Sequence, residues 1–194
     1  RMYFEQENPF AGMPNLRTQR LLLRKLNMHD AQDVYDYSSD PLVAKHVLWD
    51  AHRNVAESKS YIRYMMRKYR LGEPSSWGME YLEENRIIGT IGFMWYNEEN
   101  RSAEVGYSLS RAYWNRGLMT EALSAVVRYG FERLGHPIPD RETVRGTIGY
   151  LLEDAYTMLT GDRDPERLAR FRAYFLEVAK PRQRKETFLF PGAA

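Results

Sequence analysis

Glu104-Val-Gly-Tyr-Ser-Leu-Ser-Arg-Ala-Tyr-Trp-Asn-Arg-Gly-Leu-Met-Thr-Glu-Ala-Leu123 predicts a strand, a short loop and a helix. In the strand, Ala103, Val105, Tyr107 and Leu109 alternate with Ser102, Glu104, Gly106 and Ser108, which is typical of a strand with one buried face. After the loop the apolar residues recur at helical spacing, from Met119 to Leu134. We therefore expect a helix that begins near Met119 and packs an apolar stripe against a sheet.

Gly117 stands just before this predicted helix. The first turn of a helix has N–H groups without carbonyl partners and the positive end of the helix dipole, so it favours anions. A glycine there lets the backbone approach a phosphate without a side chain in the way. One glycine in such a connection is weak evidence by itself. The pattern predicts a pyrophosphate site and favours an acyl-CoA ligand.

Seven segments, two of them within the stretch quoted above, match the elements of a known family in order. They are residues 16–26, 30–41, 56–71, 77–82, 86–93 and 104–109, and the loop in which Trp114, Gly117 and Met119 fill the slots of the motif Gln/Arg-x-x-Gly-x-Gly/Ala. Residues 15–135 thereby resemble the GCN5-related N-acetyltransferases (GNAT), in particular the branch with the ribosomal-protein N-terminal acetyltransferases. Only the central glycine matches the general motif, although tryptophan and methionine are often found in this branch. The resemblance implies an α+β fold with a mixed, mainly antiparallel sheet and packed helices.

The same resemblance implies acetyl-CoA as cosubstrate and assigns its binding residues. The backbone of Tyr107, Ser108 and Leu109 would pair with the pantetheine arm like an added strand. The pyrophosphate would be wrapped by the loop and first helical turn, made of Asn115, Arg116, Gly117, Leu118, Met119 and Thr120. In this family the amine attacks the thioester directly, so the protein supplies proximity, a base and N–H groups for the oxyanion. The acceptor would be a primary amine of a small molecule or peptide, with a protein amino terminus as one candidate.

Glu104 is the first candidate for the catalytic base, because a carboxylate on the fourth strand has this role in several relatives. An ordinary solvated glutamate on a sheet face is the alternative, and Glu80 on the second strand is another candidate base. The four histidines show no paired spacing, so the sequence predicts neither a metal site nor a serine–histidine triad.

After Gly135 the family's fifth strand and fourth helix are not recognisable, which leaves the fold incomplete on its C-terminal side. Two amphipathic helices are expected instead, the first capped by Asp140 and the second beginning at Pro165 after Asp164. This helical hairpin, residues 134–192, resembles the cap of haloacid-dehalogenase-type phosphatases such as phosphoglycolate phosphatases. Asp162-Arg-Asp164 comes closest to that family's nucleophile motif, but helix capping explains it better.

We therefore expect two segments, an acetyl-CoA-binding segment at residues 1–135 and a helical segment at residues 136–194, as in a chimera. The first hypothesis is an active N-acetyltransferase. The alternatives are a non-catalytic recombinant fold with at most weak CoA binding and, more remotely, a phosphatase fragment. Without the fifth strand, the edge of the predicted fourth strand would be exposed, and either a homodimer or the C-terminal helices could cover it.

Composition narrows the class of protein further. The 194 residues suffice for one good core, and 28 basic against 26 acidic residues give a net charge of +2, which predicts no nucleic-acid surface. The chain has no cysteine, which excludes disulfides and thiol catalysis. No apolar run approaches the length of about 20 residues that spans a membrane, so we expect a cytoplasmic protein without a membrane partner.

Overall fold

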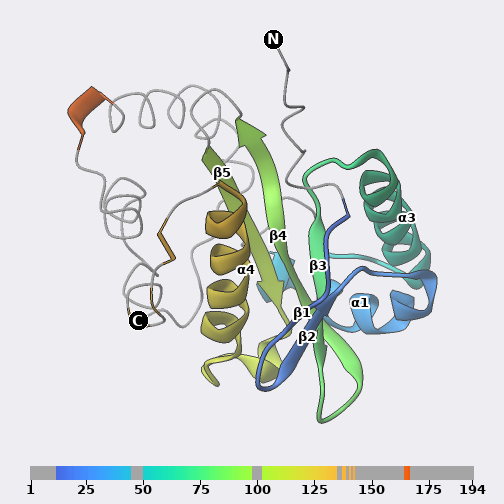
Figure 1. Cartoon of the computed structure of the whole chain (residues 1–194). Coiled ribbons are helices and arrows are strands. Elements are labelled where there is room, and N and C mark those ends of the chain that lie inside the picture. The colour runs from blue at the N-terminus through green and yellow to red at the C-terminus, as the bar shows by residue number, and fades with distance from the viewer. Residues whose placement is uncertain are drawn as a thin grey trace.

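The computed structural model describes residues 12–44, 50–97 and 102–134, with residues 137, 138, 140, 142 and 164–166. Its five strands form one antiparallel sheet in the order β1-β2-β3-β4-β5 (Figure 1). The strands are β1 (Leu16–Arg17), β2 (Leu21–Arg24), β3 (Ser76–Tyr81), β4 (Arg86–Asn97) and β5 (Ser102–Leu109). The helices are α1 (Ala31–Ser38), α2 (Pro41–Ala44), α3 (Val55–Leu71) and α4 (Leu118–Leu134), with short 3-10 helices η1 (Met28–Asp30) and η2 (Arg111–Tyr113). The predicted α+β class with an antiparallel sheet is confirmed.

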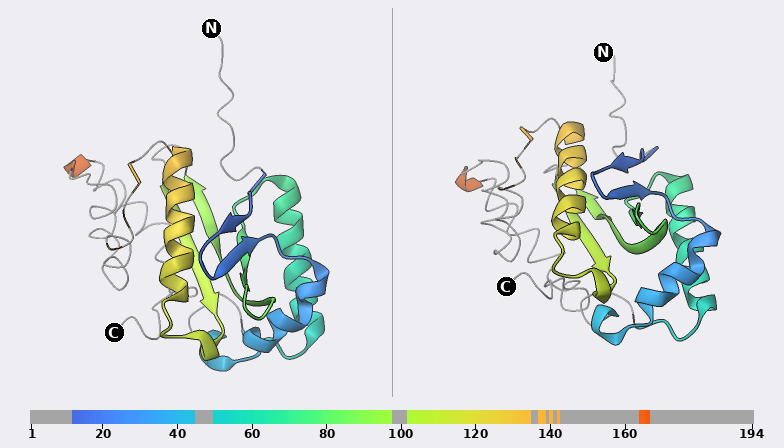
Figure 2. Two further views of the ribbon diagram at one scale, coloured as in Figure 1. Left: turned by 60° about the horizontal axis from the view of Figure 1, so that its bottom comes forward. Right: turned by 90° about the horizontal axis from the view of Figure 1, so that it is seen from below.

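The sheet separates two apolar cores. Helix α4 covers one face, and α1 and α3 cover the other (Figures 1 and 2). On the α4 side, the fully buried Trp77 meets the ring of Tyr129 edge-on at 5.5 Å between centroids, and that of Phe93 at 6.0 Å. The predicted apolar face of β5, residues 103, 105, 107 and 109, also packs into this core. On the other side, Val34 and Ile62 lie in a second core with Ile87 of β4.

The first predicted strand, residues 16–26, is wrong in one respect, because the structure forms a hairpin there. Strand β1 ends at Arg17 and β2 begins at Leu21. The turn is closed by Thr18, whose backbone N–H donates to Leu21 O at 2.9 Å and whose hydroxyl accepts from Leu21 N at 3.0 Å. A threonine that bonds its own turn in this way competes with extended pairing.

The predicted helices are confirmed with small changes at their ends. The helix expected over residues 30–41 is divided before Pro41, because the residue preceding a proline is disfavoured in helical conformation. Helix α3 begins after Asn54, whose side chain accepts from Glu57 N at 3.0 Å, and ends at Gly72 in the left-handed region at φ 65°. Both ends follow the usual chemistry of helix caps. In the C-terminal segment, Asp164 accepts from Glu166 N at 2.9 Å and residues 165 and 166 are helical, as the capping interpretation predicts.

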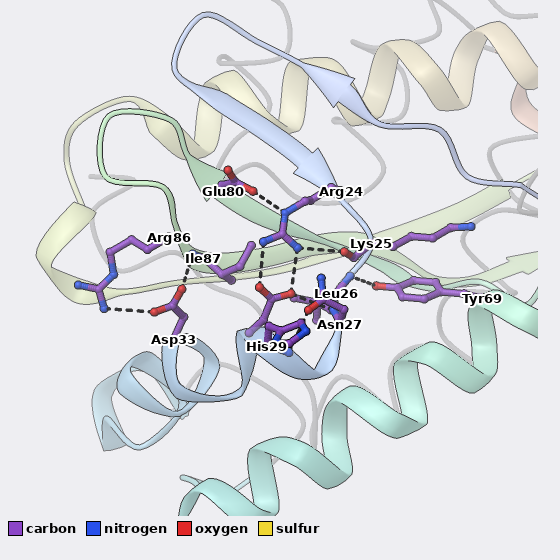
Figure 3. A network of polar contacts seen from close by, with 11 residues as sticks. Arg24, Lys25, Leu26, Asn27, His29, Asp33, Tyr69, Glu80, Arg86 and Ile87 are labelled. Atoms are coloured by element: carbon purple, nitrogen blue, oxygen red, sulfur yellow. Dashed lines mark hydrogen bonds and ion pairs between the residues drawn. The ribbon is translucent and has the colours of Figure 1, made fainter.

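A partly buried ion network joins β2 to β3 and η1 (Figure 3). The guanidinium of Arg24 donates to both carboxylate oxygens of Asp30, at 2.8 and 2.9 Å, and its Nε donates to Glu80. Asp30, only 5 % exposed, also accepts from the backbone N–H of Asn27 at 2.9 Å. The carboxylates on two separate elements are therefore held by one arginine.

We expect Arg24→Met to lower the free energy of unfolding by about 3 kcal/mol or more, because removing one partner leaves a buried charge uncompensated. Urea denaturation at pH 7 measures the loss. Arg17→Met, on the exposed β1 position of the same hairpin, is the matched control and should change stability by less than about 0.5 kcal/mol. Equal effects of the two variants would show that the network does not contribute to stability.

Candidate functional site

The connection from β5 to α4 carries the predicted phosphate loop, and its backbone has an unusual conformation. Asn115 has φ 60° and Gly117 has φ 74°, whereas Arg116 between them has no positive φ. Alternating signs of this kind turn successive N–H groups towards one point and form an anion-binding concavity. Left-handed φ also explains the glycine, because other residues adopt it at a cost.

Helix α4 adds its own free donors to this concavity. The Glu121 N–H donates to Gly117 O at 3.1 Å and is the first amide with a partner one turn back. The amides of Leu118, Met119 and Thr120 therefore precede the hydrogen-bond ladder of α4, where the helix dipole is positive. The predicted residues Asn115 to Thr120 lie together, and their backbone is suited to an anion such as pyrophosphate.

Several side chains fix the loop from outside. The indole N–H of Trp114 donates to Leu109 O at 2.8 Å and so ties the loop to the end of β5. The guanidinium of Arg116 donates to the hydroxyl of Tyr81 at 3.0 Å and lies over the rings of Tyr81 and Tyr113, 5.4 and 5.3 Å from their centroids. Tyr113 in turn donates to Glu84. Tyr81 and Glu84 lie more than 20 residues before the loop in sequence, and sequence reasoning did not find them.

On β5, the three residues predicted to meet pantetheine turn their side chains into the protein. Leu109 and Ser108 are each 7 % exposed, and the Ser108 hydroxyl lies 2.9 Å from that of Thr90. Tyr107 is partly buried against the α4-side core, and burial raises its pKa. With Ser108 and Leu109 buried, the backbone is the part of these two residues that could meet a ligand, and the strand-like pairing with pantetheine stays a prediction. Within the described residues β5 is the last strand of the sheet.

Two tyrosines lie beneath Ser108, on the face covered by α1 and α3. Burial raises the pKa of Tyr61 to about 12, although its hydrogen bond with Thr90 acts against this. Burial and the nearby Tyr61 raise the pKa of Tyr37 as well, against hydrogen bonds with Thr90 and Ser108. Both phenols therefore stay neutral well above physiological pH.

This burial predicts a stability loss in alkali. Because the pKa of Tyr61 is raised in the folded state, folding favours the neutral phenol. The contribution of Tyr61 to the free energy of unfolding is therefore complete below pH 10 and is lost as the pH rises towards 12. Urea midpoints measured from pH 8 to pH 11.5 should fall more for the wild-type chain than for Tyr61→Phe. Tyr64→Phe, at a position that is 56 % exposed, should follow the wild type. Parallel curves for all three would contradict the assignment.

Glu104 lies where the pairing of β4 with β5 changes register. Phe93 is opposite Val105 and Trp95 is opposite Glu104, so Met94 is one extra residue in β4. Such a bulge bends the strand and re-aims neighbouring side chains. Glu104 is half-buried, and by strand alternation it shares the face of Ser108 rather than that of α4.

Glu80, the other candidate base, is engaged elsewhere. Its carboxylate accepts from Arg24 in the ion network and is 18 % exposed. A proton taken up there would weaken that ion pair, which makes Glu80 a poorer candidate for the base; the role of Glu104 stays a prediction.

The described histidines are dispersed. His52 Nδ1 lies 2.8 Å from the Ser58 hydroxyl, and burial lowers its pKa, partly opposed by Glu57. His29 lies in η1, and His46 and His136 are outside the described residues. Among the residues that the structure describes, no three metal-ligating side chains gather into a site.

In the same part of the chain, no helix has both the length and the apolar character to cross a bilayer. The cytoplasmic location stays a prediction.

The model of the acetyltransferase (GNAT) domain matches residues 20–157, which include both the loop and β5. The chain belongs to the GNAT acetyltransferase family.

The GNAT match extends past Gly135, so the family's sequence pattern does not stop at the predicted junction. The resemblance of residues 134–192 to a phosphatase cap gains no support from the comparisons, and most of that segment lies outside the described residues. The division into segments 1–135 and 136–194 stays a prediction.

Individual relatives agree with the family match. The chain is 34 % identical over 122 residues to the uncharacterized N-acetyltransferase p20 of Bacillus licheniformis, covering 63 % of this chain and 68 % of that protein. A crystal structure of a GNAT-family acetyltransferase from Bacillus anthracis is similar at 25 % identity with a TM-score of 0.54, over 63 % of this chain and 69 % of the other. RimL, a ribosomal L7/L12 α-N-protein acetyltransferase solved with coenzyme A, shares the fold at 15 % identity and a TM-score of 0.50, over 58 % and 64 % of the two chains.

Proposed function

We propose that this GNAT chain transfers the acetyl group of acetyl-CoA to a primary amine. The observation that carries the proposal is the backbone of residues 115–120, where left-handed Asn115 and Gly117 lead into the unpaired first turn of α4. A pyrophosphate bound there would leave the pantetheine arm to run back along β5 from Leu109 towards Glu104. That direction brings the thioester towards the bulge at Met94.

The chemistry is a direct attack without an acyl-enzyme. The amine nitrogen forms a bond to the thioester carbon and the C–S bond breaks. The nitrogen then loses its second proton to become the amide, and the leaving thiolate of CoA takes up that proton. The attacking nitrogen must first lose the proton of its ammonium form, and Glu104 is the proposed acceptor of that proton. The loop, by holding the pyrophosphate, supplies proximity.

A protein amino terminus is the acceptor that we favour. The support is the resemblance to the ribosomal-protein branch and the fold shared with RimL, which is an α-N-protein acetyltransferase. A small-molecule amine is the other candidate. The expected homodimer through the edge of β5 is kept as a proposal, to be checked by light scattering.

Calorimetry with acetyl-CoA is the first test. We expect a dissociation constant below 1 mM, on the order of the KM values typical of enzymes. Acetyl transfer should then be assayed by mass spectrometry on three acceptors, namely a peptide with a free α-amine, the same peptide blocked at its amino terminus but containing lysine, and a small primary amine. Absence of binding heat and of any thermal shift would contradict the proposal and favour a non-catalytic fold. Binding of acetyl-CoA without transfer to any acceptor would support the cofactor site and contradict the proposed acetyl transfer.

A further inference from the structure

The turn between β1 and β2 lies beside the start of α4 (Figures 1 and 2) and contacts it through one buried carboxylate. Glu121, in the first turn of α4, has only 8 % of its side chain exposed. It accepts from the Thr18 hydroxyl at 2.6 Å, from the Arg20 backbone N–H at 2.9 Å and from Arg20 Nε at 3.1 Å. This carboxylate thus joins two segments that are 101 to 103 positions apart in sequence, at the entrance of the phosphate loop.

A carboxylate at this place opposes the binding of a phosphate. The helix terminus attracts anions, but a negative charge fixed in the same turn repels them. Burial raises the pKa of Glu121, but hydrogen bonds from Thr18 and Arg20, with the Arg20 charge, outweigh burial and lower it. Glu121 is therefore ionised, and the guanidinium of Arg20 is its counter-charge.

The remaining nitrogens of Arg20 face the loop. Nη1 donates to the carbonyl oxygen of Arg116 at 2.9 Å. Nη2 lies 3.5 Å from the place that a Cβ on Gly117 would occupy. About a third of the Arg20 side chain is exposed, at 34 %. A cation of fixed orientation therefore stands beside the residue that leaves room for the phosphate.

We propose that Arg20 is a phosphate-binding residue of the acetyl-CoA site, with its Nη2 donating to a pyrophosphate oxygen beside Gly117. This inference rests on the proposed function. Glu121 and Thr18 are positioning residues, since Glu121 holds the guanidinium and the Thr18 hydroxyl holds Glu121. Arginine suits the task, because its planar fork can serve the carboxylate, the loop carbonyl and a phosphate oxygen at once.

The test compares acetyl-CoA with S-acetylpantetheine, which has the thioester and lacks the pyrophosphate. By calorimetry, Arg20→Gln should weaken acetyl-CoA binding at least tenfold and change S-acetylpantetheine binding by less than twofold. Arg17→Gln removes the same charge from an exposed position of the same hairpin and should leave both affinities unchanged. An equal loss for both ligands, or no loss for either, would overturn the proposal.

A double variant, Arg20→Gln with Glu121→Gln, keeps a neutral hydrogen-bonding pair and guards against unfolding of the single variant. If Arg20 meets the phosphate, the double variant keeps the selective loss of acetyl-CoA affinity. If it regains wild-type affinity, Arg20 acts only by neutralising Glu121, and the direct contact is contradicted. A wild-type chain that binds no acetyl-CoA would refute the proposed function itself, whereas normal wild-type binding with an unselective Arg20→Gln variant would refute only this inference.

Discussion

Glu104→Gln is expected to lower the turnover number for amine acetylation by about 10²- to 10⁴-fold, the usual contribution of a general base. The amide has nearly the shape of the carboxylate but cannot take up the ammonium proton. Because pyrophosphate binding is the task of residues 115–120, the dissociation constant of acetyl-CoA should change by less than twofold. Steady-state kinetics with a saturating peptide amine, together with calorimetry, measures both quantities.

The pH dependence adds a second readout for Glu104. An α-amine loses its own proton near pH 8, so the deficit of Glu104→Gln should shrink as the pH rises above that value. Glu132→Gln, at an exposed position of α4, is the matched control and should show wild-type kinetics. Unchanged turnover of Glu104→Gln at neutral pH would remove Glu104 as the base, although acetyl-CoA binding by the loop would stand.

Gly117→Glu is expected to abolish measurable binding of acetyl-CoA. Gly117 has φ 74°, and a residue with a side chain in this left-handed region costs about 1–2 kcal/mol. The new carboxylate would also stand where the phosphate is expected and repel it. A loss of at least about 100-fold in affinity corresponds to roughly 2.8 kcal/mol or more. Repulsion supplies part of it, and the rest is the cost of returning a relaxed loop to the strained conformation that binds the phosphate.

The control for Gly117→Glu is Gly72→Glu at the end of α3. Gly72 has φ 65°, so the same substitution brings similar backbone strain at a place far from the loop in sequence and on the other face of the sheet. Gly72→Glu should lower the melting temperature and leave acetyl-CoA affinity within twofold of wild type. A Gly117→Glu variant that remains folded and still binds acetyl-CoA would disprove the proposed phosphate site.

The elements that the sequence predicts well are those with a regular apolar period. Strand β5 and helix α4 have such a period, and each begins within a residue or two of its predicted start. The β1–β2 turn was missed because Thr18-Gln19-Arg20 contains no glycine or proline, the usual turn residues. Its stability depends instead on Thr18 and on the distant Glu121.

In the candidate site, too, one part could be predicted from local sequence signals and another part could not. The loop backbone could be predicted, because Gly117 before a helix is a local signal. The side chains that hold the loop could not, because Arg20 and Tyr81 reach Arg116 only through the folded sheet. The charged Glu121 in the first turn of an anion-binding helix was the available signal, since such a charge requires a counter-charge nearby.

The most direct test of the central claim, that residues 115–120 hold the pyrophosphate of acetyl-CoA, is amide hydrogen exchange with and without that ligand. Saturating acetyl-CoA should slow exchange in peptides that cover residues 115–120 and, through pantetheine pairing, residues 107–109. Peptides from the exposed face of α3 serve as the internal reference and should not change. Binding of acetyl-CoA without protection at residues 115–120 would contradict the claim.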